Sequence, residues 1–427
     1  MPKNSTLSQA KVAKNDEFYT QYADIQTELN AYIEYNPDVF RGKTILLPCD
    51  DPEWSNFTKF FAQNFERYGL KKLISTSYAI ESKKYKINPE PTLFETQSPQ
   101  FDVDKSKTHG KIFVLERGDG NNRGADGSSA INQPQASRLR PRLDINDLQW
   151  TYLEGDGDFR SKEVTALRDE ADIIITNPPF SLFREFLAWI MATPGAQASS
   201  LADIGDYNVA SKDARAPGKQ FLIIGNMNAI TYKEVFPLIK GNNLWIGPSI
   251  TSGDREFRVP LEYPLAAAGW RIDDDGRHFI RVKGVHWFTN LDHGKRHQPL
   301  QLMTMEDNIM FSRHKEIQGI GYQHYDNYDA IEVPYTDAIP SDYNGIMGVP
   351  ISFLDKYCPE QFEIIGTDSP YFIEELGIGR MGEKWIKDYK EYGGTGHLTA
   401  NMHSLCLYDG EGKPLSVYKR ILIRRKK

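Results

Sequence analysis

An apolar strand that runs directly into two prolines constrains the fold of this chain more than any other stretch. Residues 172–180 have the sequence Asp-Ile-Ile-Ile-Thr-Asn-Pro-Pro-Phe. Consecutive β-branched residues are typical of a parallel strand buried on both faces, and prolines cannot extend a hydrogen-bonded ladder. Residues 181–191 then space apolar side chains as a helix does, with Ser181 as the expected N-cap. The pattern predicts a strand, a rigid turn and a helix, and open α/β sheets carry their chemistry at such turns.

The turn residues Asn177, Pro178, Pro179 and Phe180 are the predicted catalytic residues. Asn177 offers a hydrogen-bond acceptor and two donors, the prolines fix the backbone so that the Pro178 carbonyl can point into a pocket, and Phe180 offers a flat face. These groups suit a planar ring with an amino group, such as adenine. Acceptors on the amine hydrogens would favour a pyramidal nitrogen that attacks a methyl sulfonium in line. An ordinary proline-rich turn is the alternative interpretation.

The composition is that of a globular protein, with 427 residues, 40% hydrophobic and 26% charged, enough for two domains. Its three cysteines, Cys49, Cys358 and Cys406, are too scattered for a disulfide framework or a zinc cluster. No stretch has the length of a membrane span, and residues 1–10 are polar, so we expect a cytoplasmic protein without a membrane partner. The formal charge of −7 still allows a local basic surface for nucleic acid.

A second predicted strand, residues 44–47, runs into an acidic loop and then a helix over residues 58–68. The loop, residues 48–57, has the sequence Pro-Cys-Asp-Asp-Pro-Glu-Trp-Ser-Asn-Phe and lacks the glycine-rich phosphate fingerprint. Carboxylates repel phosphate but attract ammonium and sulfonium groups, so the loop favours a cationic cofactor with an adenine ring. An acidic helix start is the alternative. The expected cofactor-binding residues here are Pro48, Asp50, Asp51, Trp54 and Asn56.

The strand expected at residues 72–79 offers hydroxyls where nucleotide folds often place a ribose carboxylate. Residues 81–141 have the composition of an insertion, although residues 111–115 could form a strand. After a strand at residues 151–153, Asp156 and Asp158 could bind metal, cap a helix or touch a cofactor base. Further elements are expected as helices at residues 23–35, 162–170 and 231–239, and as a buried strand within residues 218–229.

Beyond Asn242 the pattern changes to short strands and turns, which indicates a second region. Basic residues alternate there with aromatic ones, as expected of a surface that grips phosphates and bases, or else of a solvated sheet. The residues are Arg255, Phe257, Arg258, Arg271, Arg277, Phe279, Arg281, Lys283, Trp287, Phe288, Lys295 and Arg296. His293 and His297 have a metal-ligand spacing, but the intervening Gly294 argues against a metal site. Residues 418–427 form either a basic surface or a solubilising terminus.

Taken together, these segments resemble the EcoRI-type family of adenine-specific DNA methyltransferases. The Asn-Pro-Pro-Phe turn is specific to amino-methylating enzymes as a class, and the loop at residues 48–57 narrows the choice to this family. That loop departs from the general glycine-rich Pro-x-Cys-Gly-x-Gly-x-Phe pattern. The matching segments are residues 15–20, 46–57, 155–161, 177–186, 221–232, 282–291 and 420–425.

The resemblance implies an α/β fold with a doubly wound, mostly parallel, Rossmann-like sheet in residues 1–245. Residues 246–427 would be a mixed α+β region that recognises the DNA target. The resemblance also implies S-adenosylmethionine as cofactor and 6-methyladenine in double-stranded DNA as product, formed after the base is flipped out. Asn177 and Pro178 would hold the amine and Phe180 would stack on the base. The implied cofactor pocket consists of Phe18, Tyr19, Thr20, Asp50 and Asp51, with Asp158 and Phe159 near the cofactor adenine.

Other readings stay open at this point. An RNA adenine or a protein glutamine presents a similar planar amine, and a decayed methyltransferase fold could bind nucleic acid without catalysis. The sequence does not reveal the recognised DNA sequence, the oligomeric state, or whether a cognate restriction endonuclease acts separately as part of a restriction-modification pair.

Overall fold

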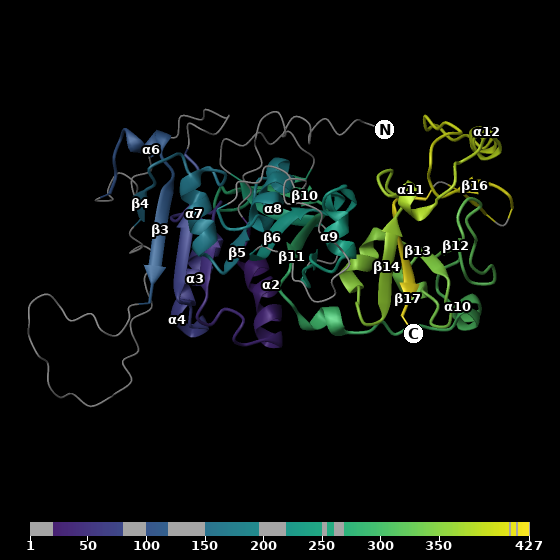
Figure 1. The fold of residues 1–427 in the computed structure, drawn as a ribbon, viewed down its shortest axis with the longest axis horizontal. Coiled ribbons are helices and arrows are strands. Elements are labelled where there is room, and N and C mark those ends of the chain that lie inside the picture. The colour runs from purple at the N-terminus through teal and green to yellow at the C-terminus, as the bar shows by residue number, and fades with distance from the viewer. Residues whose placement is uncertain are drawn as a thin grey trace, which may run out of the picture. The chain divides into compact units, whose positions relative to one another are not determined.

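The computed structural model describes residues 20–79, 100–117, 150–195, 219–249, 254–259, 269–409, 411–415 and 417–426. The chain folds into two compact units (Figure 1). The first consists of residues 1–227 and 252–291, and the second of residues 228–251 and 292–427. The functional boundary predicted at residue 245 stays a prediction. In the described ranges, no helix is both long enough and apolar enough to cross a bilayer.

The first unit contains a mixed sheet whose strands follow the order β4-β3-β2-β1-β5-β6-β11. The pairs of β1 with β2, β1 with β5 and β5 with β6 are parallel, whereas β3, β4 and β11 pair antiparallel at the edges. The protein is therefore mixed α/β, and the expected "mostly parallel" sheet is parallel only at its centre. The bounds are β1 Thr44–Leu47, β2 Lys72–Thr76, β3 Lys111–Glu116, β4 Trp150–Tyr152, β5 Ile173–Thr176, β6 Gln220–Asn226 and β11 Val285–Thr289.

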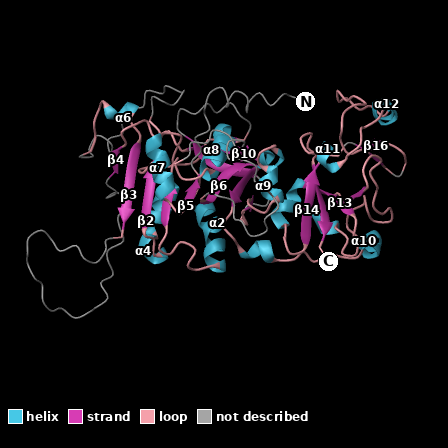
Figure 2. Cartoon of the chain, in the orientation of Figure 1, coloured by secondary structure: helices cyan, strands magenta, loops and turns pink. Residues whose placement is uncertain are grey.

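The central strands form because they are short runs of apolar residues that bury both faces. All four residues of β1 and of β5 are buried, as expected for inner parallel strands. Helices pack against this sheet (Figure 2), with α3 against β2 and α7 against β1. The helices are α2 Tyr22–Tyr35, α3 Asn56–Gln63, α4 Phe65–Tyr68, α6 Lys105–Thr108, α7 Lys162–Glu170 and α8 Phe183–Met191, with the 3-10 helix η3 Phe180–Leu182.

Two predicted helices differ from the structure. The helix expected at residues 58–68 is broken into α3 and α4, because Asn64 has a non-helical backbone and uses its side chain to donate to the Phe60 carbonyl. The helix expected at residues 231–239 is helical only in its second half, α9 Phe236–Lys240, after the 3-10 helix η5 Met227–Thr231. The strand expected within the insertion is real and is β3.

A small antiparallel sheet also belongs to the first unit. Its strand order is β8-β10-β9, with β8 Asp254–Val259, β9 Trp270–Ile272 and β10 His278–Lys283. The sharp turn between β9 and β10 includes Gly276, whose φ is +74°, and its Asp273 carboxylate accepts from Arg277. This sheet contains most of the basic and aromatic residues that the sequence singled out.

The second unit is built on a sheet with the order β12-β13-β17-β14. Residues 420–425 form the inner strand β17, in which Ile421, Leu422 and Ile423 are fully buried while Arg424 and Arg425 are exposed, so the basic surface expected at residues 418–427 stays a prediction. The strands are β7 Trp245–Ile246, β12 Ala330–Glu332, β13 Ile346–Pro350, β14 Phe362–Thr367, β15 Leu407–Tyr408, β16 Pro414–Leu415 and β17 Arg420–Arg425. The helices are α10 Met305–Phe311, α11 Ile373–Leu376, α12 Glu383–Glu391, η6 Gly294–His297, η7 Thr336–Ala338 and η8 Ile351–Lys356.

Candidate active site

The Asn-Pro-Pro-Phe turn lies at the carboxyl end of β5, the inner strand next to β1. Asn177 is partly exposed, Pro178 is buried, and Pro179 and Phe180 are partly exposed. Phe180 opens the 3-10 helix η3, in which the Leu182 amide donates to the Pro179 carbonyl at 2.9 Å. The prediction of Ser181 as N-cap is wrong, since this residue lies inside η3 and Leu182 precedes α8. The prolines thus lead the chain through a tight turn before the α-helix starts.

The loop after β1 contacts this turn through a buried carboxylate. Asp50 is 6% exposed, and its Oδ2 accepts from the Thr176 hydroxyl at 2.6 Å while its Oδ1 accepts from the Ser55 hydroxyl at 2.6 Å. Burial raises the pKa of Asp50 to about 6, although the hydrogen bonds from Ser55 and Thr176 lower it. Both oxygens of this predicted cofactor carboxylate are therefore engaged within the protein.

Thr20 joins the same loop to the side chain of Asn177. It is 5% exposed, its carbonyl accepts from Asn56 Nδ2 at 2.8 Å, and its hydroxyl accepts from Asn177 Nδ2 at 3.3 Å. Three residues predicted from separate parts of the sequence, Thr20, Asn56 and Asn177, thus meet in one place. The other two predicted residues of the N-terminal segment, Phe18 and Tyr19, lie outside the described residues.

The remaining loop residues are ordered by local hydrogen bonds. Oδ1 of Asp51 accepts from the amides of Glu53 and Trp54 at 2.9 and 3.3 Å, and the buried Pro48 has a carbonyl that accepts from Thr76. Trp54 itself is 41% exposed, so its indole faces solvent beside the loop. An exposed aromatic ring at this position is compatible with the prediction that it lies against a cofactor.

The predicted insertion contributes to the loop as well. The Glu53 carboxylate accepts from the Trp150 indole at 2.9 Å and from the Lys111 ammonium at 2.5 Å. Lys111 also lies over the Trp150 ring, 4.5 Å from its centroid. Because Lys111 and Trp150 belong to β3 and β4, these two strands hold one side of the acidic loop. The sequence reasoning missed this contact, since nothing in the pattern links positions so far apart.

The Gly-Asp-Gly-Asp segment after β4 packs more tightly than its sequence alone reveals. Gly157 has a φ of +79°, and a Cβ there would lie 2.1 Å from the Ser77 carbonyl oxygen, so only glycine fits. Asp158 accepts from Arg160 at 2.9 and 2.6 Å. Phe159 is buried against Phe186 and Trp189 of α8, with ring centroids 5.0 and 5.5 Å apart. The ring of Phe159 is therefore a core side chain, and a cofactor contact there would fall to its backbone or to Asp158.

The small β8-β10-β9 sheet lies next to the Asn-Pro-Pro-Phe turn. The rings of Phe180 and Phe257 meet edge to face at 6.5 Å, and Gln21, which precedes α2, donates to the Glu256 carbonyl at 3.2 Å. Cross-strand partners share a face of a sheet. Ile280 pairs with Phe257 and Trp270, so these apolar residues lie on the face that meets the turn.

The opposite face of this sheet is cationic. Phe279 pairs with Arg258 and Arg271, and all three lie on this face together with Arg281. The arginines are exposed, whereas the Phe279 ring is covered by the Arg271 guanidinium at 4.3 Å. One carboxylate, Glu256, binds Arg271 through two hydrogen bonds of 2.8 and 2.6 Å.

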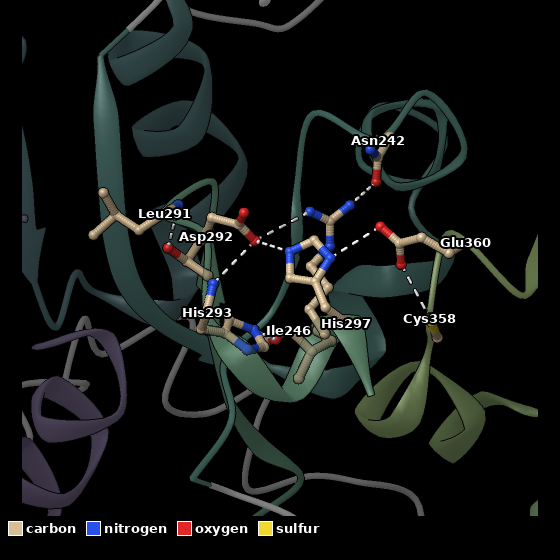
Figure 3. A network of polar contacts seen from close by, with 10 residues as sticks. Asn242, Ile246, Leu291, Asp292, His293, His297, Cys358 and Glu360 are labelled. Carbon is tan, nitrogen blue, oxygen red and sulfur yellow. Dashed lines mark hydrogen bonds and ion pairs between the residues drawn. The ribbon is translucent and has the colours of Figure 1, made fainter. Parts of the chain in front are cut away.

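The histidines with metal-ligand spacing belong to the second unit and have separate partners (Figure 3). His293 is buried, its Nε2 lies 3.1 Å from the Ile246 carbonyl, and burial lowers its pKa to about 4. His297 lies between Asp292 and Glu360, at 2.8 and 2.9 Å, and these carboxylates raise its pKa against the effect of burial. Within the described ranges, no group of three or more His, Cys, Asp or Glu side chains is arranged to hold a metal ion.

The residues that sequence reasoning missed are mostly hydroxyls. Ser55 caps α3, accepting from the Phe57 and Thr58 amides, and Thr176 ends β5. A serine directly before a helix is a recognisable cap signal, so Ser55 could have been found. Thr176 carried no signal, because its partner Asp50 lies 126 positions away.

The polar groups at this edge of the sheet are mainly acceptors, and they suit a cationic cofactor. The loop after β1 carries the carboxylates of Asp50, Asp51 and Glu53 and contains no Lys or Arg, and the Lys111 ammonium that reaches it from β3 is bound to Glu53. Such an acceptor-rich edge suits the ammonium and sulfonium groups of S-adenosylmethionine and would repel a diphosphate. The chemistry of the residues thus agrees with the group that the sequence led us to expect.

The chain matches the family described as adenine-specific methyltransferase EcoRI over residues 6–195 and 215–426. It is 39% identical to "Type II methyltransferase M.EcoRI" of Escherichia coli, over 85% of this chain and 89% of that protein. Two mycoplasma proteins named type II methyltransferases are also similar: M.MpnI of Mycoplasma pneumoniae is 32% identical, over 84% of both chains, and M.MgeORF184P of Mycoplasma genitalium is 31% identical, over 84% of this chain and 85% of its own length. No solved structure matches the chain. The chain belongs to the EcoRI family of adenine-specific methyltransferases.

Proposed function

We propose that this enzyme transfers a methyl group from S-adenosylmethionine to the exocyclic amine of an adenine within a specific double-stranded DNA sequence. The observation that carries the proposal is the Asn-Pro-Pro-Phe turn at the carboxyl end of β5, hydrogen-bonded through Thr20 to the acidic loop after β1. The family to which the chain belongs supports the choice of adenine. A separate cognate restriction endonuclease and a cytoplasmic location remain predictions.

We also propose that the central sheet is of the doubly wound, Rossmann-like kind. Its parallel strands have the order β2-β1-β5-β6, so the strand order reverses between β1 and β5. Ligands of such sheets bind outside the carboxyl ends of the strands at this reversal. The loop after β1 and the turn after β5 both start there, which supports the proposal that a cofactor and a methyl acceptor bind side by side.

The catalytic turn would act by accepting hydrogen bonds from the amine. Because the Asn177 Nδ2 is held by Thr20, Oδ1 is the end of the amide that accepts, together with the Pro178 carbonyl. Bound S-adenosylmethionine supplies an electrophilic methyl group on a sulfonium. The amine nitrogen would form the new bond to this carbon, the sulfur would keep the electrons of the broken bond, and one amine proton would leave to solvent. Asp51, Trp54 and Asp158 are the expected cofactor contacts.

The target adenine would reach the turn by base flipping, which costs roughly a few kcal/mol. Phe180 offers its partly exposed ring to the flipped base. The cationic face of the β8-β10-β9 sheet, defined by Arg258, Arg271 and Arg281, suits the DNA backbone and belongs to the same unit as the turn. The predicted recognition region after residue 245 would then act together with this sheet.

The test is transfer of labelled methyl from S-adenosylmethionine to unmethylated duplex DNA by the purified protein, with Asn177→Ala alongside. We expect label in 6-methyladenine and a fall in rate of at least about 100-fold in the variant, since a positioned hydrogen-bond group contributes that much. The exposed Asn36→Ala substitution is the control and should leave the rate unchanged. Label in RNA or protein but not in DNA would contradict the proposal, as would an Asn177→Ala protein with the normal rate.

A further inference from the structure

Six residues from three segments form a closed ring around the catalytic turn, made of four hydrogen bonds and the two peptide links 55–56 and 176–177. Thr176 donates to Asp50, and the adjacent Asn177 donates to Thr20. On the other side, Ser55 donates to Asp50, and the adjacent Asn56 donates to Thr20. We call this set the Asp50–Thr20 ring. Its members are Thr20, Asp50, Ser55, Asn56, Thr176 and Asn177.

The direction of the bonds at Asp50 is set by its surroundings. The Ser55 oxygen already accepts from the amides of Phe57 and Thr58, so its single proton is directed to Asp50. Both hydroxyl-to-carboxylate distances are 2.6 Å, which is typical of charge-assisted bonds. The Asp50 backbone is fixed too, since its carbonyl accepts from the Ser75 hydroxyl and its amide donates to Thr76. Asp50 therefore acts as a fixed double acceptor between β5 and the start of α3.

Thr20 plays the matching part on the other side of the turn. Its hydroxyl accepts from the Asn177 amide nitrogen, and its carbonyl accepts from Asn56 at the start of α3. The Asn177 side chain is thus oriented by a residue ahead of α2, and that residue is oriented by the loop after β1. No sequence pattern connects these positions.

We propose that Asp50 and Thr20 are positioning residues for Asn177, and that the ring transmits the conformation of the loop after β1 to the catalytic amide. This inference rests on the proposed role of Asn177. It gives Asp50 a task different from the cofactor contact predicted from the sequence, because both of its carboxylate oxygens bind inside the ring. A loop that adjusts when a ligand binds would then also adjust the catalytic amide.

The experiment measures kcat and KM for DNA and for S-adenosylmethionine with the full chain carrying Thr20→Val, Thr20→Ser or Asp50→Asn. We expect kcat to fall about 10- to 100-fold for Thr20→Val, since small misplacements of a catalytic group have effects of that size. Thr20→Ser should restore most of the rate, and both KM values should change little. Asp50→Asn should lower kcat while the thermal midpoint stays the same or rises, because an amide is less costly to bury than a carboxylate.

Thr165→Val is the matched control. Like Thr20, Thr165 is 5% exposed, and its hydroxyl accepts one side-chain hydrogen bond, from the Trp189 indole at 3.1 Å. Thr165 lies outside the ring. This variant should lose stability without losing kcat. If Thr20→Val does not fold, the nearly isosteric Asp50→Asn carries the test.

Three outcomes would overturn the inference: unchanged kcat in Thr20→Val and Asp50→Asn, a raised KM for S-adenosylmethionine with normal kcat, or no rescue by Thr20→Ser. The Asn177→Ala protein separates the two proposals. If Asn177→Ala is inactive while the ring variants keep their full rate, the positioning role of Asp50 and Thr20 is contradicted and the proposed function is not. If Asn177→Ala keeps its rate, the proposed function itself is contradicted.

Discussion

At the scale of single residues, Asp50 is a group beside the proposed catalytic turn whose ionisation opposes folding. A carboxylate that is almost fully buried loses hydration, and two hydroxyl donors offset only part of that loss, so its pKa rises to about 6. The neighbouring Asp51 carboxylate raises it further. Keeping this group ionised near neutral pH costs about 3 kcal/mol of folding free energy at most, as its pKa shift implies.

The pH dependence of activity and of stability should therefore run in opposite directions. A carboxyl pKa that is raised on folding makes the native state bind the proton more tightly, so the contribution of Asp50 to stability falls as pH rises from about 4 to about 6. Activity should rise in the upper part of that window, because the ionised group accepts from both Thr176 and Ser55. We expect an acid limb in kcat near pH 6 that disappears in Asp50→Asn.

The measurement is a pH profile of kcat at saturating substrates. Asp38→Asn, which removes an exposed carboxylate paired with Arg41, is the control and should keep the limb. A limb that persists unchanged in Asp50→Asn would assign it to another group.

At the scale of secondary-structure elements, the small β8-β10-β9 sheet has two faces with different roles. Phe257 on one face meets Phe180 of the Asn-Pro-Pro-Phe turn, and the other face carries Arg258 and Arg281. A sheet that is anchored to the turn on one side and cationic on the other would hold DNA at a fixed distance from the reacting amine. The small sheet can lie beside the turn because residues 252–291 belong to the first unit.

Replacing these arginines should weaken DNA binding in a salt-dependent way. We expect Arg258→Gln and Arg281→Gln each to reduce the slope of log affinity against log salt by about 0.9, as each phosphate contact contributes that much. Arg67→Gln, an exposed arginine in α4 of the same unit, should leave the slope unchanged. Fluorescence anisotropy with a duplex oligonucleotide measures the slope, and identical slopes in all four proteins would exclude this face.

The sequence predicted some secondary-structure elements closely, but it did not predict the contacts between them. The strands β1 and β5 and the helix α7 were predicted almost to the residue, because short apolar runs and a helical period are local signals. The ring was not predicted, although Thr20, Asp50, Asn56 and Asn177 were each singled out, because hydrogen-bond partners far apart in the sequence leave no local pattern. The hydrogen bonds that Asp50 accepts from Ser55 and Thr176 were not predicted, and its role in cofactor binding stays a prediction.

At the scale of the whole molecule, the chain leaves the first unit, enters the second and then returns to the first. Residues 228–251 belong to the second unit, while residues 252–291 return to the first. The returning segment supplies β11, which pairs with β6 from Val285 with Asn226 to Thr289 with Leu222. The functional boundary predicted near residue 245 is therefore not a position at which the chain can be divided into two fragments that fold independently.

Fragments test this arrangement directly. Residues 1–291 contain every described strand of the first unit and should fold, giving a cooperative thermal transition by circular dichroism. Residues 1–245 lack β11 and the small sheet, so β6 would keep an unpaired edge and the fragment should aggregate. Equal folding of both fragments would show that residues 252–291 are dispensable for the first unit.

The late return of β11 matters during synthesis on the ribosome. About 60 residues separate the end of β6 from the start of β11, which at typical translation speeds is a delay of roughly 3 to 12 seconds. Throughout that delay β6 lacks the partner that later covers its open edge, and residues of the second unit have already emerged without the rest of their sheet. Lower growth temperatures, or chaperones that shield nascent strands, should therefore raise the yield of folded enzyme more than sequence changes near its termini do.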